Sequence, residues 1–105
     1  RGYSSVIGEI PNMLSDVYQA LADPTRRDIL RHLRDGDLTA GELAERFPLA
    51  KSTLSGHFQV LRQAGLIVAE KQGTRVVYSI NQSAFEEALG AIVALLDLRA
   101  EKAPR

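Results

Sequence analysis

Apolar residues recur at helical spacing near the start of the chain. A first stripe, at positions i, i+3, i+4 and i+7, consists of Leu14, Val17, Tyr18 and Leu21. This spacing places all four side chains on one face, so it predicts a short first helix. The pair Asp23-Pro24 then combines a good N-cap with a residue that suits the first helical turn. A second helix is therefore expected from about Pro24 to the turn pair Asp35-Gly36.

Two further helices are predicted in the next part of the chain. The sequence TAGE at residues 39–42 fits the capping box, in which two side chains satisfy free backbone N–H groups at a helix start. A fourth helix is expected from about Lys51 to Gln63 or Ala64, and Gly65 is placed to end it in a left-handed conformation. Its apolar stripe, at i, i+4 and i+7, consists of Leu54, Phe58 and Leu61.

The hydrophobic period changes after the fourth helix. The runs LIVAEKQ and RVVYSI are rich in strand-forming residues, and they predict a β-hairpin with its tip at Gln72-Gly73-Thr74. A second capping box, SAFE at residues 83–86, then opens a long helix to about Leu98. The expected fold is mainly α with a small β-hairpin, in the order of four helices, two strands and a fifth helix. This is the winged helix-turn-helix plan, in which the second helix of the pair enters the DNA major groove.

The chain of 105 residues is long enough for one small domain with one core. We expect this domain to span residues 13–100, with a polar tail at residues 101–105. Residues 1–12 precede Met13 and are expected to be a loose extension or residues added ahead of the natural start. No run approaches the roughly 20 apolar residues of a membrane helix, and no signal peptide is visible, so we expect a cytoplasmic protein without a membrane partner.

Charge is distributed unevenly along the chain. The 13 basic and 13 acidic residues cancel over the whole sequence. In the segment 51–75, however, four basic residues stand against one acidic residue, Glu70, which leaves a net charge of +3. Such a segment can bind a polyanion, because local potential acts at contact. The sequence has no cysteine, which excludes disulfides, thiolate metal ligands and cysteine redox switching.

The expected fourth helix has an outer face of small polar residues. At about 100° per residue from Leu54, the apolar stripe lies within about 40° and the polar residues lie opposite. The residues that we predict to contact DNA from this helix are Lys51, Ser52, Thr53, Ser55, Gly56, His57, Gln59, Arg62 and Gln63. Hydroxyl and amide groups can read base edges, whereas Lys51 and Arg62 would meet phosphates. The alternative is a solvated face that happens to carry little charge.

Three residues permit more than one interpretation. His57 sits about 60° from the Leu54 direction, where it either braces the helix through a hydrogen bond or contacts phosphate. Gly56 costs about 1 kcal/mol relative to alanine in mid-helix. It either lets DNA approach closely or leaves the operator to be read with one fewer side chain. Arg26 shares the apolar face of the second helix, so a structural ion pair is favoured over a DNA contact.

The tip of the expected hairpin is basic. The residues predicted to contact DNA from this wing are Lys71, Gln72, Gly73, Thr74 and Arg75. A basic hairpin beside a reading helix suits contact with phosphates or the minor groove, and the alternative is a turn that only improves solubility. No catalytic residue and no enzyme activity are expected, because no metal ligand set, nucleophile–base pair or glycine-rich phosphate loop is visible.

The last helix carries more apolar surface than one small core can cover. Its apolar stripe consists of Phe85, Leu89, Ile92 and Leu96, and Ala88, Val93 and Leu95 widen it to about 160° around the helix. A stripe that faces only a core usually spans about 100° or slightly more. The excess predicts a C2 homodimer, and the alternative is a monomer with a fuller core. The predicted dimer interface consists of Leu14, Val17, Tyr18, Leu21, Phe85, Leu89, Ile92, Val93 and Leu96.

Four segments, in this order and spacing, resemble one known family. They are ALADPTRRDILRHL, LTAGELAERF, KSTLSGHFQVLRQAGLI and GTRVVYSI, within roughly residues 17–83. Together they are similar to the ArsR/SmtB family of bacterial transcriptional repressors, and closest to its SdpR-like autorepressor branch. The resemblance implies a homodimer that binds a palindromic operator in double-stranded DNA and represses its own operon. It also implies that the first and last helices form the dimer interface.

Many members of this family release DNA when a metal binds, but the metal positions do not match here. Residues 38–42, which correspond to the thiolate site, contain no cysteine. The last helix offers Glu86, Glu87 and Asp97 but no histidine for the other common site. We therefore expect no metal, no cofactor and no metal response at these sites.

Two other functions remain as alternatives. One is a winged helix that binds proteins, which the polar outer face of the fourth helix disfavours. The other is a DNA-binding repressor that is released by an organic ligand or a protein partner. A cavity between the first helix, the last helix and the core would be the place to look for such an effector.

Overall fold

The computed structural model describes residues 14–102, and the side chains of residues 14–95. Its elements are a helix at residues 14–22, α2 (Pro24–Arg34), β1 (Leu38–Thr39), α3 (Ala40–Arg46), α4 (Lys51–Gln63), β2 (Ile67–Gln72), β3 (Arg75–Ile80) and α5 (Gln82–Lys102). The helices α3 and α4 form the helix-turn-helix, and the β2–β3 hairpin forms the wing. The predicted fold class and the predicted order of the helices and the wing strands are confirmed. The extension expected at residues 1–12 lies outside the described residues.

Short-range hydrogen bonds set two helix starts where the sequence predicts them. Asp23 caps α2, because its Oδ2 accepts from the backbone N–H of Arg26 at 3.1 Å. In the capping box of α3, the N–H of Glu42 donates to Thr39 Oγ1 at 3.0 Å, and the N–H of Thr39 donates to Glu42 Oε1 at 2.8 Å. After α4, Gly65 adopts the predicted left-handed conformation with a φ of 79°, which turns the chain toward β2.

The sheet contains a third strand that the sequence does not predict. β1 pairs antiparallel with β3, with Leu38 opposite Tyr78 and Thr39 opposite Val77, so the strand order is β1-β3-β2. A strand of two residues is too short to show an alternating pattern. Its pairing also depends on a partner far along the chain, so local sequence gives no sign of it.

The start of α5 corrects a second prediction. The capping box predicts Ser83 as the N-cap, but α5 begins earlier and Asn81 caps it, with its Oδ1 accepting from the N–H of Ala84 at 3.3 Å. The reason is that β3 is paired with β2 up to Ile80, so Asn81 is already held in place as the strand ends. The helix also continues to Lys102, into the segment predicted as a polar tail.

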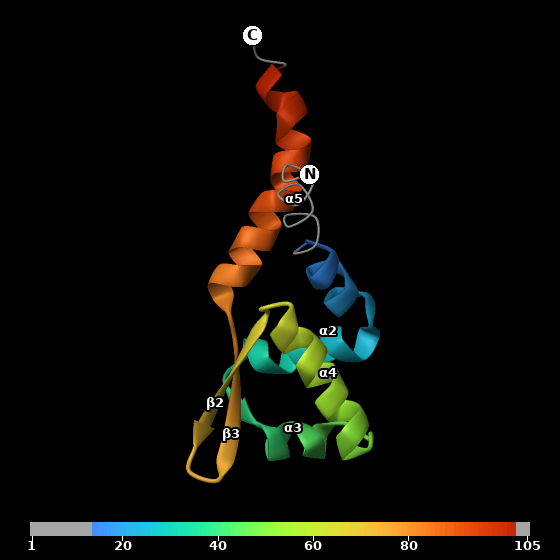
Figure 1. Ribbon diagram of the computed structural model, residues 1–105, viewed down its shortest axis with the longest axis vertical. Coiled ribbons are helices and arrows are strands. Elements are labelled where there is room, and N and C mark those ends of the chain that lie inside the picture. The colour runs from blue at the N-terminus through green and yellow to red at the C-terminus, as the bar shows by residue number, and fades with distance from the viewer. Residues whose placement is uncertain (1–13, 103–105) are drawn as a thin grey trace, which may run out of the picture.

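The core lies between the first helix, α2, α3, α4 and the sheet. Its largest fully buried side chains are Ile29, Leu43, Leu54, Leu61 and Leu66. Phe58 of α4 packs against Tyr78 of β3 with ring centroids 4.6 Å apart, which joins the helix to the wing. The start of α5 packs on this core through Phe85 and Ala88, and Figure 1 shows the rest of the helix running away from the body. Within residues 14–102, no helix is both long and apolar enough to cross a membrane.

Candidate nucleic-acid interface

The helix α4 presents two faces of opposite character. Leu54, Phe58 and Leu61 are at most 5% exposed and hold the helix against the core. Eight of the predicted contact residues are exposed on its other sides, namely Lys51, Ser52, Thr53, Ser55, Gly56, Gln59, Arg62 and Gln63. The ninth, His57, is half-buried. Ordinary core packing of the apolar stripe is therefore enough to turn the polar residues outward.

This exposed face is suited to hydrogen bonding with little charge. Its hydroxyl and amide groups can donate and accept, and the major groove displays a distinct pattern of donors and acceptors for each base pair. Lys51 at one end and Arg62 near the other add positive charge, and no carboxylate occurs anywhere in α4. Such a surface can select a sequence through its amides and hydroxyls while its two cations attract phosphate.

Gly56 lies in this face with open space in front of it. A Cβ built at this position would meet no atom within 4 Å. Packing within the chain therefore does not require glycine, although glycine disfavours the helix by about 1 kcal/mol relative to alanine. The role of Gly56 is therefore set by what the outer face of α4 contacts, and not by packing within the chain.

The wing is a tight two-residue hairpin. Its strands are paired up to Gln72 opposite Arg75, and Gly73 has a φ of 64° while Thr74 does not enter the positive-φ region. A positive φ at only the first central residue is typical of a type II′ turn. All five predicted wing residues are exposed: Lys71, Gln72, Gly73, Thr74 and Arg75. The two cations of this set thus stand at the end of the hairpin, where a DNA backbone can reach them.

A hollow of about 370 Å³ lies between α4 and β2. It places Gln59, Arg62 and Gln63 of α4 alongside the first strand of the wing. Val68 of β2 also lines this hollow and is 47% exposed. Sequence reasoning misses Val68, because a valine in a strand is expected to be buried. The sequence gives no signal for its exposure, because Leu66, Ile67 and Val68 are all apolar.

His57 points toward the scaffold of the protein. Its ring Nδ1 lies 3.2 Å from Nη1 of Arg26 and 3.9 Å from Oδ2 of Asp23, and its side chain is 18% exposed. This geometry favours the bracing role over a phosphate contact through Nδ1. Within the described residues, Arg26 does not form the predicted ion pair. Its guanidinium instead donates to two main-chain carbonyls of the first helix, which lie at a helix end where carbonyls lack partners.

Asp23 completes this cluster between the helices. Partial burial would raise the pKa of its carboxyl group. The hydrogen bond from the backbone N–H of Arg26 and the nearby positive charge of Arg26 oppose that effect, and the pKa is lowered from its ordinary value. A charged carboxylate therefore sits at the N-terminus of α2, close to the half-buried ring of His57 in α4.

The first helix and α5 expose several apolar side chains. The exposed fractions are 47% for Tyr18, 61% for Leu89, 40% for Val93 and 56% for Leu95. Tyr18, Leu89 and Val93 belong to the predicted interface. Four other residues of that interface are half-buried, namely Leu14, Leu21, Phe85 and Ile92. Val17 differs from the prediction, because it is 8% exposed and belongs to the core of its own chain. Leu96 lies outside the residues whose side chains are described.

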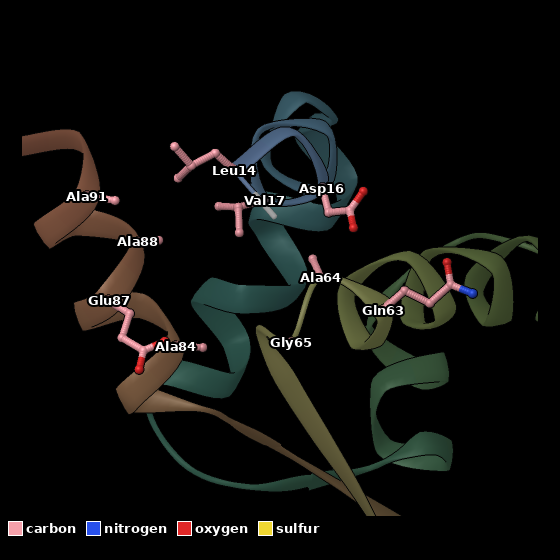
Figure 2. A pocket seen from close by; sticks show the side chains of 10 residues that line it. All are labelled: Leu14, Asp16, Val17, Gln63, Ala64, Gly65, Ala84, Glu87, Ala88 and Ala91. Carbon is pink, nitrogen blue, oxygen red and sulfur yellow. The ribbon is translucent and has the colours of Figure 1, made fainter. Parts of the chain in front are cut away.

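A cavity of about 330 Å³ separates the first helix from α5, as Figure 2 shows. Ala88 and Ala91 point into it from α5, toward Leu14 and Val17 of the first helix. Ala64, at the end of α4, lines it as well. The cavity therefore touches both the exposed apolar helices and the end of the helix that carries the polar face.

Comparison with known proteins identifies the family. A family model for a helix-turn-helix domain matches residues 21–69. The transcriptional repressor SdpR of Bacillus subtilis is 38% identical over 76 residues, which cover 72% of this chain and 84% of that protein. A crystal structure of an ArsR family transcriptional regulator matches with a TM-score of 0.76 at 36% identity, over 87% of this chain and 93% of that one. The chain belongs to the ArsR family.

Another relative of this ArsR-family chain is the HTH-type transcriptional regulator CmtR of Mycobacterium tuberculosis. It is 41% identical over 83 residues, which cover 79% of this chain and 70% of that protein. The family assignment and the winged helix-turn-helix fold agree. The chain is a DNA-binding transcriptional regulator of the repressor type.

The positions that correspond to the metal sites of the ArsR family carry no sulfur or imidazole ligand. The segment 38–42 forms β1 and the start of α3, where Thr39 and Glu42 bind each other in the capping box. Within the described residues, no group of three or more His, Cys, Asp and Glu side chains is placed to hold a metal ion. Asp97 lies outside the described side chains. The donors at these positions are oxygen atoms, whereas zinc and related metals favour sulfur and imidazole ligands.

Proposed function

We propose that this ArsR-family regulator acts as a homodimer that binds a palindromic operator and represses its own operon. The observation that carries the proposal is the exposed face of α4, which is polar and almost uncharged and lies beside strand β2 of the basic wing. Hydrogen-bonding groups select a sequence, and cations supply affinity for DNA in general. This role requires binding and no catalysis, and acting on chromosomal DNA places the protein in the cytoplasm.

The two parts of the interface have different tasks in this proposal. The helix α4 enters the major groove, where Ser52, Gln59 and Gln63 reach base edges. Lys51 and Arg62, together with the hydroxyls at the margins of the face, meet the sugar–phosphate backbone. The wing cations contact phosphates or the minor groove beside this site.

The exposed apolar residues of the first helix and α5 support the dimer. Tyr18, Leu89 and Val93 each leave 40% or more of their surface exposed, and apolar patches of this kind mark interaction sites. α5 also extends beyond the body, so a second copy can pack along it without contacting α4 (Figure 1). A C2 dimer would set two recognition helices about one DNA turn, roughly 34 Å, apart, which matches a palindromic operator.

The signal that releases the operator is not a metal at the known family positions, because those positions offer only oxygen ligands. The cavity of about 330 Å³ favours a second version of the proposal, in which an organic ligand or a protein partner enters between the first helix and α5. A module that binds only proteins is less well supported, because the exposed face of α4 carries no large apolar side chain.

Fluorescence-anisotropy titration tests the proposal directly. The labelled duplex comes from the region upstream of the protein's own gene, and the titration is run at two salt concentrations with scrambled competitor. We expect tight, salt-sensitive binding that survives the competitor. Equal and weak binding to both duplexes would overturn autorepression at this site. Absence of binding at low salt would overturn the DNA-binding role and favour the protein-interaction module.

A further inference from the structure

Two arginines of α2 hold the end of the first helix. Carbonyl groups in the last turn of a helix have no partner within that helix. Arg26 donates from Nε to the carbonyl of Ala20 and from Nη2 to the carbonyl of Gln19, both at 2.8 Å. Arg27 donates from Nη1 to the carbonyl of Leu21 at 2.7 Å. Two neighbouring guanidinium groups thus satisfy three consecutive carbonyls at this helix end.

Arg26 makes one contact that Arg27 is not placed to make. Its Nη1 lies 3.2 Å from Nδ1 of His57 in the recognition helix. A guanidinium group can only donate, so this contact requires that Nδ1 accept and carry no proton. Arg26 is half-buried, whereas Arg27 is exposed. All three nitrogens of the Arg26 guanidinium are therefore engaged, two with the first helix and one with α4.

We propose that Arg26 is a positioning residue that couples the first helix to the orientation of α4 through His57. The inference rests on the proposed DNA-reading role of α4. His57 lies between Gly56 of the exposed face and Phe58 of the core stripe, so a shift of its ring moves the polar face relative to the scaffold. The planar, rigid fork of arginine suits this role, since it can hold three partners in one fixed geometry.

The coupling joins two functional surfaces of the proposed repressor. The first helix carries part of the exposed apolar surface and lines the cavity beside α5, while α4 carries the polar face. A displacement of the first helix by a partner or a ligand would move the carbonyls that Arg26 holds. A contiguous chain of hydrogen bonds would then carry that displacement to the recognition helix.

The first test compares Arg26→Gln with the matched control Arg27→Gln by anisotropy titration. Both variants remove hydrogen bonds to the same helix end, but only the first breaks a contact with α4. We expect R26Q to weaken operator binding by about tenfold, the effect of one hydrogen bond with a charged donor. Binding to scrambled DNA and the salt dependence should stay unchanged, since no phosphate contact is lost. R27Q should leave the ratio of operator to scrambled affinity at the wild-type value.

A double-mutant cycle with His57→Ala separates coupling from general loss of structure. The double variant R26Q/H57A should bind the operator no more weakly than the worse single variant, because both changes break the same link. The effects of R27Q and H57A should multiply. Arg26→Lys keeps the charge without the fork, so it should repeat the loss of R26Q and serves if that variant fails to fold. Melting curves followed by circular dichroism show which variants are folded at the assay temperature.

Two results would overturn the coupling. The first is that the Arg26 variants keep the wild-type ratio of operator affinity to scrambled-DNA affinity. The second is that the loss of operator affinity in R26Q/H57A equals the product of the losses in the two single variants. Both results compare a variant with wild-type protein that binds the operator, so neither contradicts the proposed function. Wild-type protein that binds no DNA would instead remove the proposed function, and the coupling with it.

Discussion

At the scale of single residues, Gly56 is the position where stability and DNA contact can be separated. A Cβ at this site would meet no atom within 4 Å, and alanine is the better helix former. We therefore expect Gly56→Ala to raise the free energy of unfolding by about 1 kcal/mol. Urea denaturation of both proteins measures this difference, and a less stable variant would contradict the packing described for this face.

Gly65→Ala is the matched control, because Gly65 has a φ of 79° and alanine is strained there. This variant should lose about 1 kcal/mol of stability or more. Operator titration of G56A then decides between the two interpretations of Gly56. Weaker binding would show that DNA approaches the backbone closely, whereas unchanged binding would show that the operator is read with one fewer side chain.

Asp23 gives the fold a pH dependence at the same scale. Its lowered pKa means that the folded state favours the charged carboxylate more than the unfolded state does. This contribution is fully present above the ordinary aspartate value and is lost as the pH falls through the lowered value of the folded state. The stability advantage of wild type over Asp23→Asn should therefore persist from pH 7 to about pH 5 and shrink below about pH 4.

Urea denaturation at pH 7 and pH 3 measures this change. Asparagine is also a good N-cap, so the variant removes the charge while keeping a capping side chain. A difference between the two proteins that stays constant down to pH 3 would contradict the lowered pKa of Asp23.

At the scale of elements, the wing and the recognition helix should separate affinity from sequence choice. The wing cations Lys71 and Arg75 are exposed on either side of the turn. We expect Lys71→Ala and Arg75→Ala each to weaken operator and scrambled DNA alike. Each should also reduce the salt slope by about 0.9, the effect of one lost phosphate contact. Anisotropy titrations at several salt concentrations measure both quantities.

Gln59→Ala serves as the contrasting variant in α4. It should lower operator affinity selectively, because an amide that reads a base edge has no equivalent contact on scrambled DNA. The salt slope should stay at the wild-type value. If the wing variants changed sequence choice while Gln59→Ala changed only the salt slope, the proposed division of tasks would be wrong.

At the scale of the whole molecule, the exposed face of α5 should determine assembly. Leu89 of α5 is 61% exposed. A charge at this position would have to be buried in the proposed dimer, which is costly without a partner. We therefore expect Leu89→Glu to shift the protein from dimer to monomer and to weaken operator binding at least tenfold. Sedimentation velocity measures the first effect and anisotropy titration the second.

Ser83→Glu is the control, because it adds the same charge to the same helix at an exposed polar position. It should leave the dimer intact. A wild-type protein that sediments as a monomer would remove the dimer from the proposed function, and a Leu89→Glu variant that stays dimeric would move the interface elsewhere.

The sequence by itself determined the elements that depend on neighbouring residues. Asp23 and Thr39 start their helices as predicted, because a capping hydrogen bond forms between residues three apart. The exposed polar face of α4 was also predictable, since a buried stripe of regular period leaves the intervening positions outside. The left-handed conformation of Gly65 was predictable for a similar reason, because only glycine enters this region without strain.

Tertiary structure decided the features that join residues far apart in the chain. The pairing of β1 with β3 and the contact of Arg26 with His57 have no counterpart in any local period. The capping box at Ser83 shows most clearly that a local motif does not by itself fix a helix start. It matches the capping-box motif as well as the box at Thr39 does. There the end of the paired strand β3 brings Asn81 to the cap position first. Local sequence offers several places where a helix could begin, and the packing of the rest of the chain selects one of them.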